Sequence, residues 1–142
     1  EIGSDSPREV IVPNAAAREY LDFEHGKIAD SQLRSDLVDY DMNMHAIGLT
    51  HFRTFEEKIA GVRSAAPMVM KYVGTEAEVT KSELLLAIMG SQGLGWEGDG
   101  FSKSEIDTLR LWAMSKIMTI AGGTSEIQLN VIAKNVLQLP QS

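Results

Sequence analysis

Apolar residues recur at helical spacing over most of this chain. Between about Asp30 and Gly61 they follow one another every three to five positions, which places them near one face of a long helix. A second long helix is expected from Pro67, because proline is favoured at the first helical position, to Gly90. The apolar positions of the first of these helices are Leu33, Leu37, Tyr40, Met44, Ile47, Phe52, Phe55 and Ile59.

The second long helix contains a possible interruption. Gly74 and Thr75 are weak helix formers in its interior. If the helix breaks there, Thr80 and Glu83 have the spacing of a capping box and would start its second half.

The N-terminal residues indicate less regular structure. Residues 1–13 contain one glycine, two serines and two prolines, and we expect them to be an irregular lead-in with a short extended segment at 10–12. A first helix is predicted from Asn14, as N-cap, to about Glu24, with Gly26 ending it.

Two later helix starts are marked by capping boxes. The loop of residues 90–103 is rich in glycine, and Ser102 with Glu105 at its end predicts a helix that runs toward residue 120. Ser125 with Gln128 predicts a last helix, with Ser125 as N-cap, and Pro140 terminates it.

The turn before that last helix is the most informative stretch. Gly122 and Gly123 permit positive φ and a close approach of the backbone to a ligand. A glycine turn that leads into a helix N-terminus presents free N–H groups and a positive dipole end, which suit a phosphate. A hinge between two packed helices explains the same residues without any ligand.

These elements predict an all-α fold, an antiparallel four-helix bundle over residues 14–142.

The net charge of −7 offers no basic stripe, so we expect no nucleic-acid partner. The chain has no uninterrupted apolar run of membrane-spanning length, so we expect no membrane association. No signal peptide is visible, and we expect a cytoplasmic location by default. Because it begins at Glu1 rather than Met, we expect it to be part of a longer protein.

Few residues have the spacing that a catalytic or metal site requires. His45 and His51 are six positions apart rather than three or four, so we expect no metal site. Glu97 and Asp99 are interpreted as loop carboxylates that keep the loop hydrated, and Trp96 as an interface or ring-stacking residue. The seven methionines are expected to fill core gaps or line an adaptable pocket.

Three segments resemble the C-terminal domain of acyl-CoA dehydrogenases. Residues 118–140, MTIAGGTSEIQLNVIAKNVLQLP, resemble the signature that ends those enzymes. Residues 26–33, GKIADSQL, resemble the family segment GKPIADFQ without its proline. Residues 88–93, IMGSQG, resemble the turn LLGGNG, with Ser91 in place of its second glycine.

The resemblance implies a role in FAD-dependent dehydrogenation of an acyl-CoA thioester. It matches Thr124, Ser125 and Glu126 to a turn that contacts FAD, and Gly123 to a position beside the thioester. It matches Gly90 and Ser91, as one pair, to a turn that meets the FAD of a neighbouring subunit.

The same resemblance implies partners for this chain but assigns it no catalytic base. Many family members have a glutamate as catalytic base where this chain has Gly122, so no catalytic residue is assigned here. Asp22 stands near a family arginine that contacts FAD, and Ala113-Met114 replace an Arg-Asp pair. The implied partners are acyl-CoA, electron-transferring flavoprotein or a similar acceptor, and further copies in a dimer or tetramer, or a related subunit in a hetero-oligomer. The alternatives are a catalytically silent subunit of a heteromeric flavoenzyme and a bundle that only mediates assembly.

Overall fold

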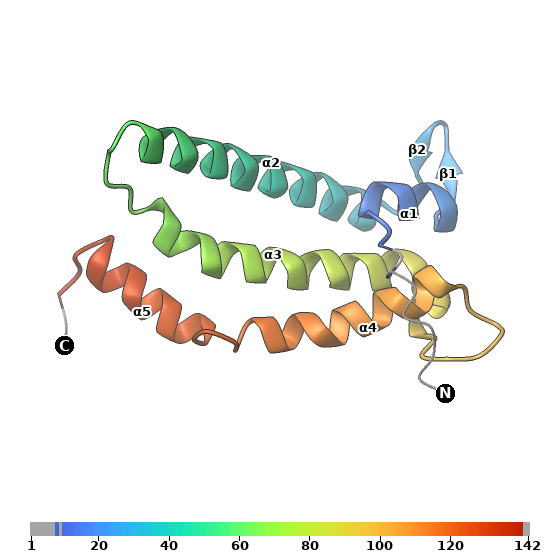
Figure 1. The fold of residues 1–142 in the computed structure, drawn as a ribbon. Helices are drawn as coiled ribbons and strands as arrows, with labels where there is room; N and C mark the ends of the chain where they lie inside the picture. Colours follow the sequence, from blue (N-terminus) through green and yellow to red (C-terminus); the bar gives the residue numbers. More distant parts are fainter. Residues whose placement is uncertain (1–7, 9, 141–142) are drawn as a thin grey trace. The chain divides into compact units, whose positions relative to one another are not determined.

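The computed structural model describes residue 8 and residues 10–140, and these form an all-α chain with one small hairpin (Figure 1). The all-α prediction is confirmed, whereas the four-helix bundle stays a prediction. No helix among the described residues is long and apolar enough to cross a membrane. The elements are α1 Pro13–Tyr20, β1 Phe23–Glu24, β2 Lys27–Ile28, α2 Ser31–Ile59, α3 Ala66–Met89, the 3₁₀ helix η1 Gly90–Leu94, α4 Lys103–Met118 and α5 Ser125–Asn135.

The first helix is shorter than predicted. It begins at Pro13, and the extended residue before it, Val12, is the N-cap, so the prediction of Asn14 as N-cap was wrong. Proline has its ring-fixed φ and no N–H to satisfy, which makes it the natural first helical residue. The predicted extended segment at 10–12 forms no strand in its described residues.

A hairpin replaces the predicted last turn of this helix. β1 pairs antiparallel with β2 through Phe23 opposite Ile28 and Glu24 opposite Lys27. The two-residue loop, His25 and Gly26, has positive φ at both positions (49° and 75°), as a type I′ turn requires. Gly26 therefore reverses the chain between two strands instead of ending a helix.

The long helix α2 starts and ends as its sequence predicts. The Asp30 carboxylate accepts hydrogen bonds from Gln32 N (2.8 Å) and Leu33 N (2.9 Å), which satisfies two of the unpaired N–H groups of the first turn. At the other end Gly61 has φ +70°, and Val62 N donates to Glu57 O at 2.9 Å, a left-handed glycine C-cap.

The helix α3 is unbroken over its whole length. The hydroxyl of Thr75 donates back to the carbonyl oxygens of Lys71 (2.9 Å) and Tyr72 (3.1 Å), so Thr75 is accommodated within the helix. The break considered at Gly74 and Thr75 is therefore absent, and Thr80 starts no new helix.

The chain forms two compact units, and the buried apolar residues all belong to the first. This unit comprises residues up to 37 together with 81–113. The buried apolar side chains that the structure describes share this unit because small alanines of α1 and a leucine-rich end of α3 pack there. They are Pro13, Ala16, Ala17, Leu37, Leu84, Leu85, Ile88 and Met89.

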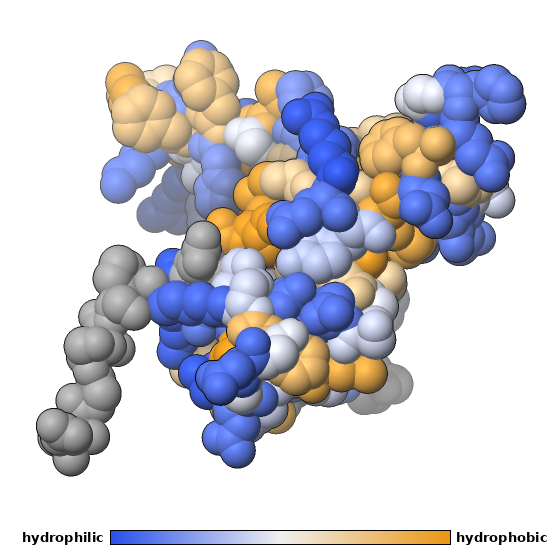
Figure 2. Space-filling view, turned by 90° about the vertical axis from the view of Figure 1, so that its right-hand side faces the viewer, coloured by the Kyte–Doolittle hydropathy of each residue, from blue (hydrophilic) through white to orange (hydrophobic). Residues whose placement is uncertain are grey.

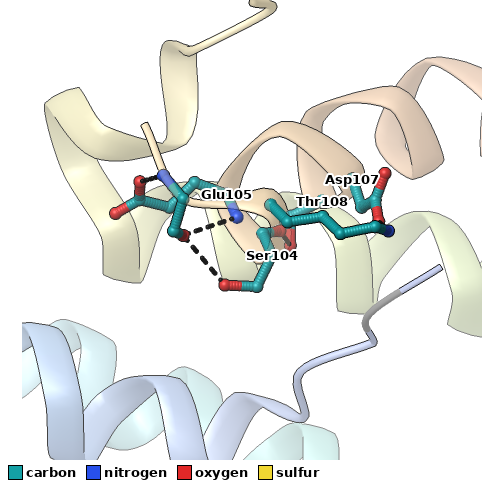
Figure 3. Close-up of polar contacts among 6 residues, drawn as sticks. Ser104, Glu105, Asp107 and Thr108 are labelled. Carbon is teal, nitrogen blue, oxygen red and sulfur yellow. Dashed lines mark hydrogen bonds and ion pairs between the residues drawn. The ribbon is translucent and has the colours of Figure 1, made fainter. Parts of the chain in front are cut away.

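The capping box of α4 lies in this first unit (Figure 3). Glu105 N donates to Ser102 Oγ at 3.3 Å, and Ser102 N donates to Glu105 Oε2 at 2.6 Å, as predicted. The Tyr20 hydroxyl donates to the other carboxylate oxygen at 3.0 Å and so ties α1 to α4. Burial, followed by the neighbouring Glu105 carboxylate, raises the pKa of Tyr20 to about 12.

In the second unit, residues 38–80 with 114–142, many large apolar side chains are exposed and others are half-buried. Of its described residues only Ser115 is buried. Figure 2 views the molecule from the side that carries α1 and the hairpin of the first unit, where apolar surface also lies between hydrophilic side chains. The large apolar residues of this unit that are exposed include Met42, Leu49, Phe52, Phe55, Ile59, Met68, Ile117, Ile120, Ile127 and Leu137. Apolar surface on this scale is typical of proteins that bind a partner.

Candidate functional site

The predicted ligand turn has the backbone shape that its glycines suggest. Gly122 and Gly123 both have positive φ, at 72° and 108°. A Cβ at Gly123 would lie 2.8 Å from Gln128 Nε2, whereas a Cβ at Gly122 would meet no atom within 4 Å. Space therefore adjoins Gly122, and the turn between α4 and α5 is open on that side.

The residue that caps α5 is Thr124. Thr124 is extended, and its Oγ1 accepts the hydrogen bond of Ile127 N at 3.4 Å. The prediction of a Ser125–Gln128 capping box was wrong by one position, since threonine is also a good N-cap and precedes Ser125. The Gln128 amide instead donates to Gly122 O at 3.1 Å and closes the turn. The helix also ends earlier than predicted, at Asn135 rather than at Pro140.

Because Ser125 does not cap the helix, its side chain is available to α3. Its hydroxyl donates to Glu76 Oε1 at 2.5 Å, and both side chains are half-buried. One turn and a half earlier on α3, Lys71 Nζ donates to Gly123 O at 2.7 Å. We call Lys71 and Glu76 the α3 anchors, because they hold the turn from both of its ends.

The α3 anchors were missed by the sequence reasoning. They lie 52 and 49 positions from the groups that they bind. Neither belongs to a motif, and a lysine or a glutamate in a long helix is usually a solvated surface residue. Only the packing of α3 beside the turn identifies them.

The charges around the turn favour polar ligands of two kinds. The first N–H groups of a helix have no intrahelical acceptor; Thr124 accepts that of Ile127 and the Glu126 carboxylate accepts that of its own residue, so the N–H group considered for a ligand is that of Ser125. Such N–H groups attract phosphate oxygens. The exposed Glu126 carboxylate, whose pKa is lowered mainly by a hydrogen bond from Thr124, is an acceptor suited to a ligand hydroxyl.

A cavity of about 590 Å³ lies in the same unit. Glu76 belongs both to its wall and to the α3 anchors, so the cavity reaches the residue that holds Ser125. Its lining is otherwise largely apolar: Tyr40, Asn43, Met44, Ala46, Ile47, Thr50, Val69, Met70, Tyr72, Val73, Ala77 and Thr80 complete it.

The methionines divide between pocket, core and surface. Met44 and Met70 line the cavity and Met89 is buried in the first unit, as predicted. The remaining four are exposed and fill no core gap: Met42, Met68, Met114 and Met118.

The second predicted cofactor turn lies in the other compact unit. Gly90 has φ +55° and begins η1, and Ser91 follows it with an exposed side chain. Thr124, Ser125 and Glu126 thus lie together, whereas Gly90 and Ser91 form a separate turn in residues 81–113.

The glycine loop after η1 is held by an arginine of α4. The Arg110 guanidinium lies 5.6 Å from the centroid of the Trp96 ring, and its Nη2 donates to Trp96 O at 3.1 Å. Gly95 allows the ring of Phe101 to approach, since a Cβ there would lie 2.2 Å from the ring. Trp96 therefore stacks within its own chain and remains 54% exposed.

Other titratable residues form no further cluster in the described part of the chain. No group of three metal-ligating side chains occurs among the described residues. His45 and His51 are exposed on α2, and Glu97 and Asp99 are exposed in the glycine loop.

Comparison with known proteins adds one match. A family model described as acyl-CoA dehydrogenase, C-terminal domain, matches residues 14–137. The matched span includes both glycine turns and the α3 anchors. No curated protein matches the chain significantly.

Proposed function

Since the chain belongs to the acyl-CoA dehydrogenase C-terminal domain family, we propose that it supplies part of the FAD site of an acyl-CoA dehydrogenase within a longer protein. The observation that carries the proposal is the open turn at Gly122, which the α3 anchors hold at the N-terminus of α5. A turn held rigid from outside is pre-organised for a ligand and loses little entropy on binding.

The residues of the turn fit FAD by the chemistry of their donors and acceptors. The Ser125 N–H at the start of α5 suits a phosphate oxygen, and on binding the Thr124 hydroxyl exchanges its hydrogen bond to Glu126 for one to the ligand. Glu126 suits a ribose or ribityl hydroxyl, because its carboxylate accepts hydrogen bonds and repels phosphate. The proposal assigns a second contact, to the FAD of a neighbouring subunit, to Gly90 and Ser91.

FAD, when bound, supplies the acceptor for the hydride that leaves Cβ of the acyl-CoA thioester. The residues of this chain bind and orient the cofactor and the substrate. The proposal places the thioester beside the backbone of Gly123, whose carbonyl is held by Lys71 and whose missing side chain makes room for Gln128. Gly122 cannot take the Cα proton, so the base has to be a carboxylate outside this turn. We therefore expect the 142 residues alone to be inactive.

The proposed partners follow from the family and from the exposed surface of the second unit. The substrate is an acyl-CoA, and electron-transferring flavoprotein or a similar acceptor reoxidises the cofactor. The exposed apolar residues of α2, α4 and α5 support an oligomer, either of this chain or with a related subunit.

One observation favours a second candidate function. A glycine at position 122 is also what a catalytically silent subunit of a heteromeric flavoenzyme would carry, with the base on its partner. Such a subunit would still bind the cofactor through Thr124. An assembly bundle without any flavin contact would not.

The test is an FAD titration of the protein at its native length, followed by quenching of flavin fluorescence. Thr124→Ala removes the cap and one ligand hydroxyl, and we expect about tenfold weaker binding, which corresponds to the ~1.4 kcal/mol of one hydrogen bond. The matched control is Thr54→Ala, whose hydroxyl donates only to Thr50 O within α2. Equal affinities of the two variants, or no binding at all, would contradict the proposal.

A further inference from the structure

Lys71 carries a positive charge that its hydrogen bond to the glycine turn does not account for. Its side chain is half-buried, and its ammonium group, which has three N–H donors, donates to one acceptor among the described residues, Gly123 O at 2.7 Å. Lysine side chains that leave water are normally paired with a carboxylate. In the described part of the chain, no carboxylate forms an ion pair with Lys71. The ammonium group is therefore suited to an anion from outside these residues.

The carboxylate of the other α3 anchor is engaged elsewhere. Glu76 follows Lys71 by five positions on α3, whereas side chains on a helix meet at spacings of three or four. Its Oε1 accepts the Ser125 hydroxyl at 2.5 Å. The positions that would face Lys71 on its own helix carry no acid: they are Pro67, Met68, Gly74 and Thr75.

The Gly123 carbonyl transmits this charge toward the ligand side of the turn. Gly123 C=O and Thr124 N–H belong to one planar peptide group, so a cation bonded to the oxygen polarises the peptide and strengthens its N–H as a donor. Two residues of chain span at most about 7 Å, which places the ammonium nitrogen within about 10 Å of the Ser125 N–H. That is about one Debye length at 0.1 M salt, so a ligand anion at this N–H interacts with Lys71.

The carboxylates at the turn disfavour a phosphate ligand. Glu76 is half-buried beside Ser125, and the Glu126 carboxylate is exposed on the first turn of α5. Both repel a phosphate, and the chain as a whole has a net charge of −7. Of the described side chains that hydrogen-bond to the turn, Lys71 is the one cation that opposes this repulsion.

We propose that the charge of Lys71, and not only its hydrogen bond, selects a phosphate-bearing ligand for this turn. Lys71 is then a specificity-determining residue, with no part in the chemistry of dehydrogenation. The inference rests on the proposed function for the identity of the ligand, since FAD and acyl-CoA both carry phosphates. It requires only a phosphate group, so it holds or fails separately from the FAD proposal.

Substitutions of Lys71 separate its charge from its hydrogen bond. Lys71→Arg keeps both, whereas Lys71→Gln keeps an N–H donor without the charge. If Lys71 only holds the turn, Lys71→Gln binds a phosphate ligand as the unmodified protein does. If its charge selects phosphate, the affinity falls in Lys71→Gln although the turn is retained. Hydrogen exchange of the Ile127 amide, which donates to Thr124 Oγ1, verifies in each variant that the turn is retained.

The measurement is the salt dependence of the dissociation constant, on the protein at its native length. FAD is titrated at about 0.05 M and about 0.5 M NaCl and followed by quenching of flavin fluorescence. In Lys71→Gln we expect the Kd to rise about five- to tenfold at low salt, and to lie within about twofold of the unmodified value at high salt, where the charge is screened. Lys71→Arg should bind as the unmodified protein does at both salt concentrations.

Lys134→Gln is the matched control. It makes the same change in net charge, and Lys134 is exposed in the last turn of α5. It lies nine positions after Ser125, about 14 Å along the helix axis and beyond one Debye length at 0.1 M salt. We therefore expect a Kd within about twofold of the unmodified value.

Two further ligands identify the source of the phosphate. CoA carries phosphates without a flavin, and inorganic diphosphate carries no other group; both are titrated by calorimetry at the same two salt concentrations. A salt-sensitive loss in Lys71→Gln with FAD and diphosphate assigns Lys71 to the cofactor, and one with CoA and diphosphate assigns it to the substrate. The same loss with diphosphate in a protein that binds no FAD would support the inference and contradict the FAD proposal.

Two outcomes would overturn the inference. In one, Lys71→Gln weakens binding equally at both salt concentrations, or not at all, which would leave Lys71 as a structural anchor alone. In the other, none of the three ligands binds the protein.

Discussion

Replacement of Glu76 by alanine removes one of the two α3 anchors of the glycine turn. The carboxylate accepts the Ser125 hydroxyl at 2.5 Å, a short hydrogen bond to a charged group. Such bonds contribute about 1.5–3 kcal/mol, and the half-buried setting of both side chains favours the lower value. A loss of about 1.4 kcal/mol makes local opening of the turn roughly tenfold more frequent.

Hydrogen exchange at the start of α5 measures that opening directly. The amides to follow are Ile127 N, which donates to Thr124 Oγ1, and Gln128 N, which donates to Thr124 O. In Glu76→Ala we expect both to exchange about tenfold faster, while the remaining Lys71 contact keeps the turn from full release. Glu76→Gln keeps an acceptor oxygen and should raise exchange only about threefold.

A double-mutant cycle separates this contact from a general loss of stability. Ser125→Ala removes the other half of the same hydrogen bond, so Glu76→Ala/Ser125→Ala should exchange no faster than either single variant. Glu97→Ala, in the glycine loop, is the control. Its amides at Ile127 and Gln128 should exchange at the same rates as those of the unmodified chain. Additive effects in the double variant, or unchanged exchange in Glu76→Ala, would refute the role assigned to this anchor.

Three further changes test other parts of the structure. The pKa of Tyr20 is about 10 in the unfolded chain and about 12 in the folded one, so the free energy of unfolding falls as the pH rises from 10 toward 12. Tyr20→Phe should abolish this fall, measured by urea titrations at pH 9 and 11. An equal fall in the variant and the unmodified chain would contradict the role of Tyr20. Gly123→Ala has to hold φ +108° with its Cβ 2.8 Å from Gln128 Nε2, so we expect about 1–3 kcal/mol of destabilisation, and an unaltered Tm would speak against the strain. Arg110→Ala should raise acrylamide quenching of fluorescence from Trp96, because the guanidinium that lies over the ring is removed; equal quenching would mean that the cation–π contact does not order the loop.

The helices were predictable from the sequence where local signals specify them. Apolar spacing located α2 and α3, Pro67 indicated the start of α3 to within one residue, and a capping box located the start of α4. Ser102 and Glu105 have the capping roles predicted for them, because a cap depends on residues only two or three positions away. The cap that Asp30 provides for α2 is equally local, but it was not predicted. The start of α5 was misassigned by one residue, since Thr124 and Ser125 are both good caps and only the tertiary contact of Ser125 decides between them.

Contacts between distant segments could not be predicted in this way. The hairpin at β1 and β2 has strands of two residues, too short to show a period of alternation. The α3 anchors depend on packing across some fifty residues. The apolar spacing placed Phe52, Phe55 and Ile59 on one face of a long helix, and only the structure shows that these side chains are exposed.

The most direct test of the account is the visible absorbance spectrum of this protein isolated from its cells at native length. The account predicts a bound flavin, with a band at about 450 nm that is lost when the protein is unfolded and filtered. A colourless protein that stays colourless after incubation with FAD and removal of the excess would contradict it, and would leave the family fold with a role in assembly alone.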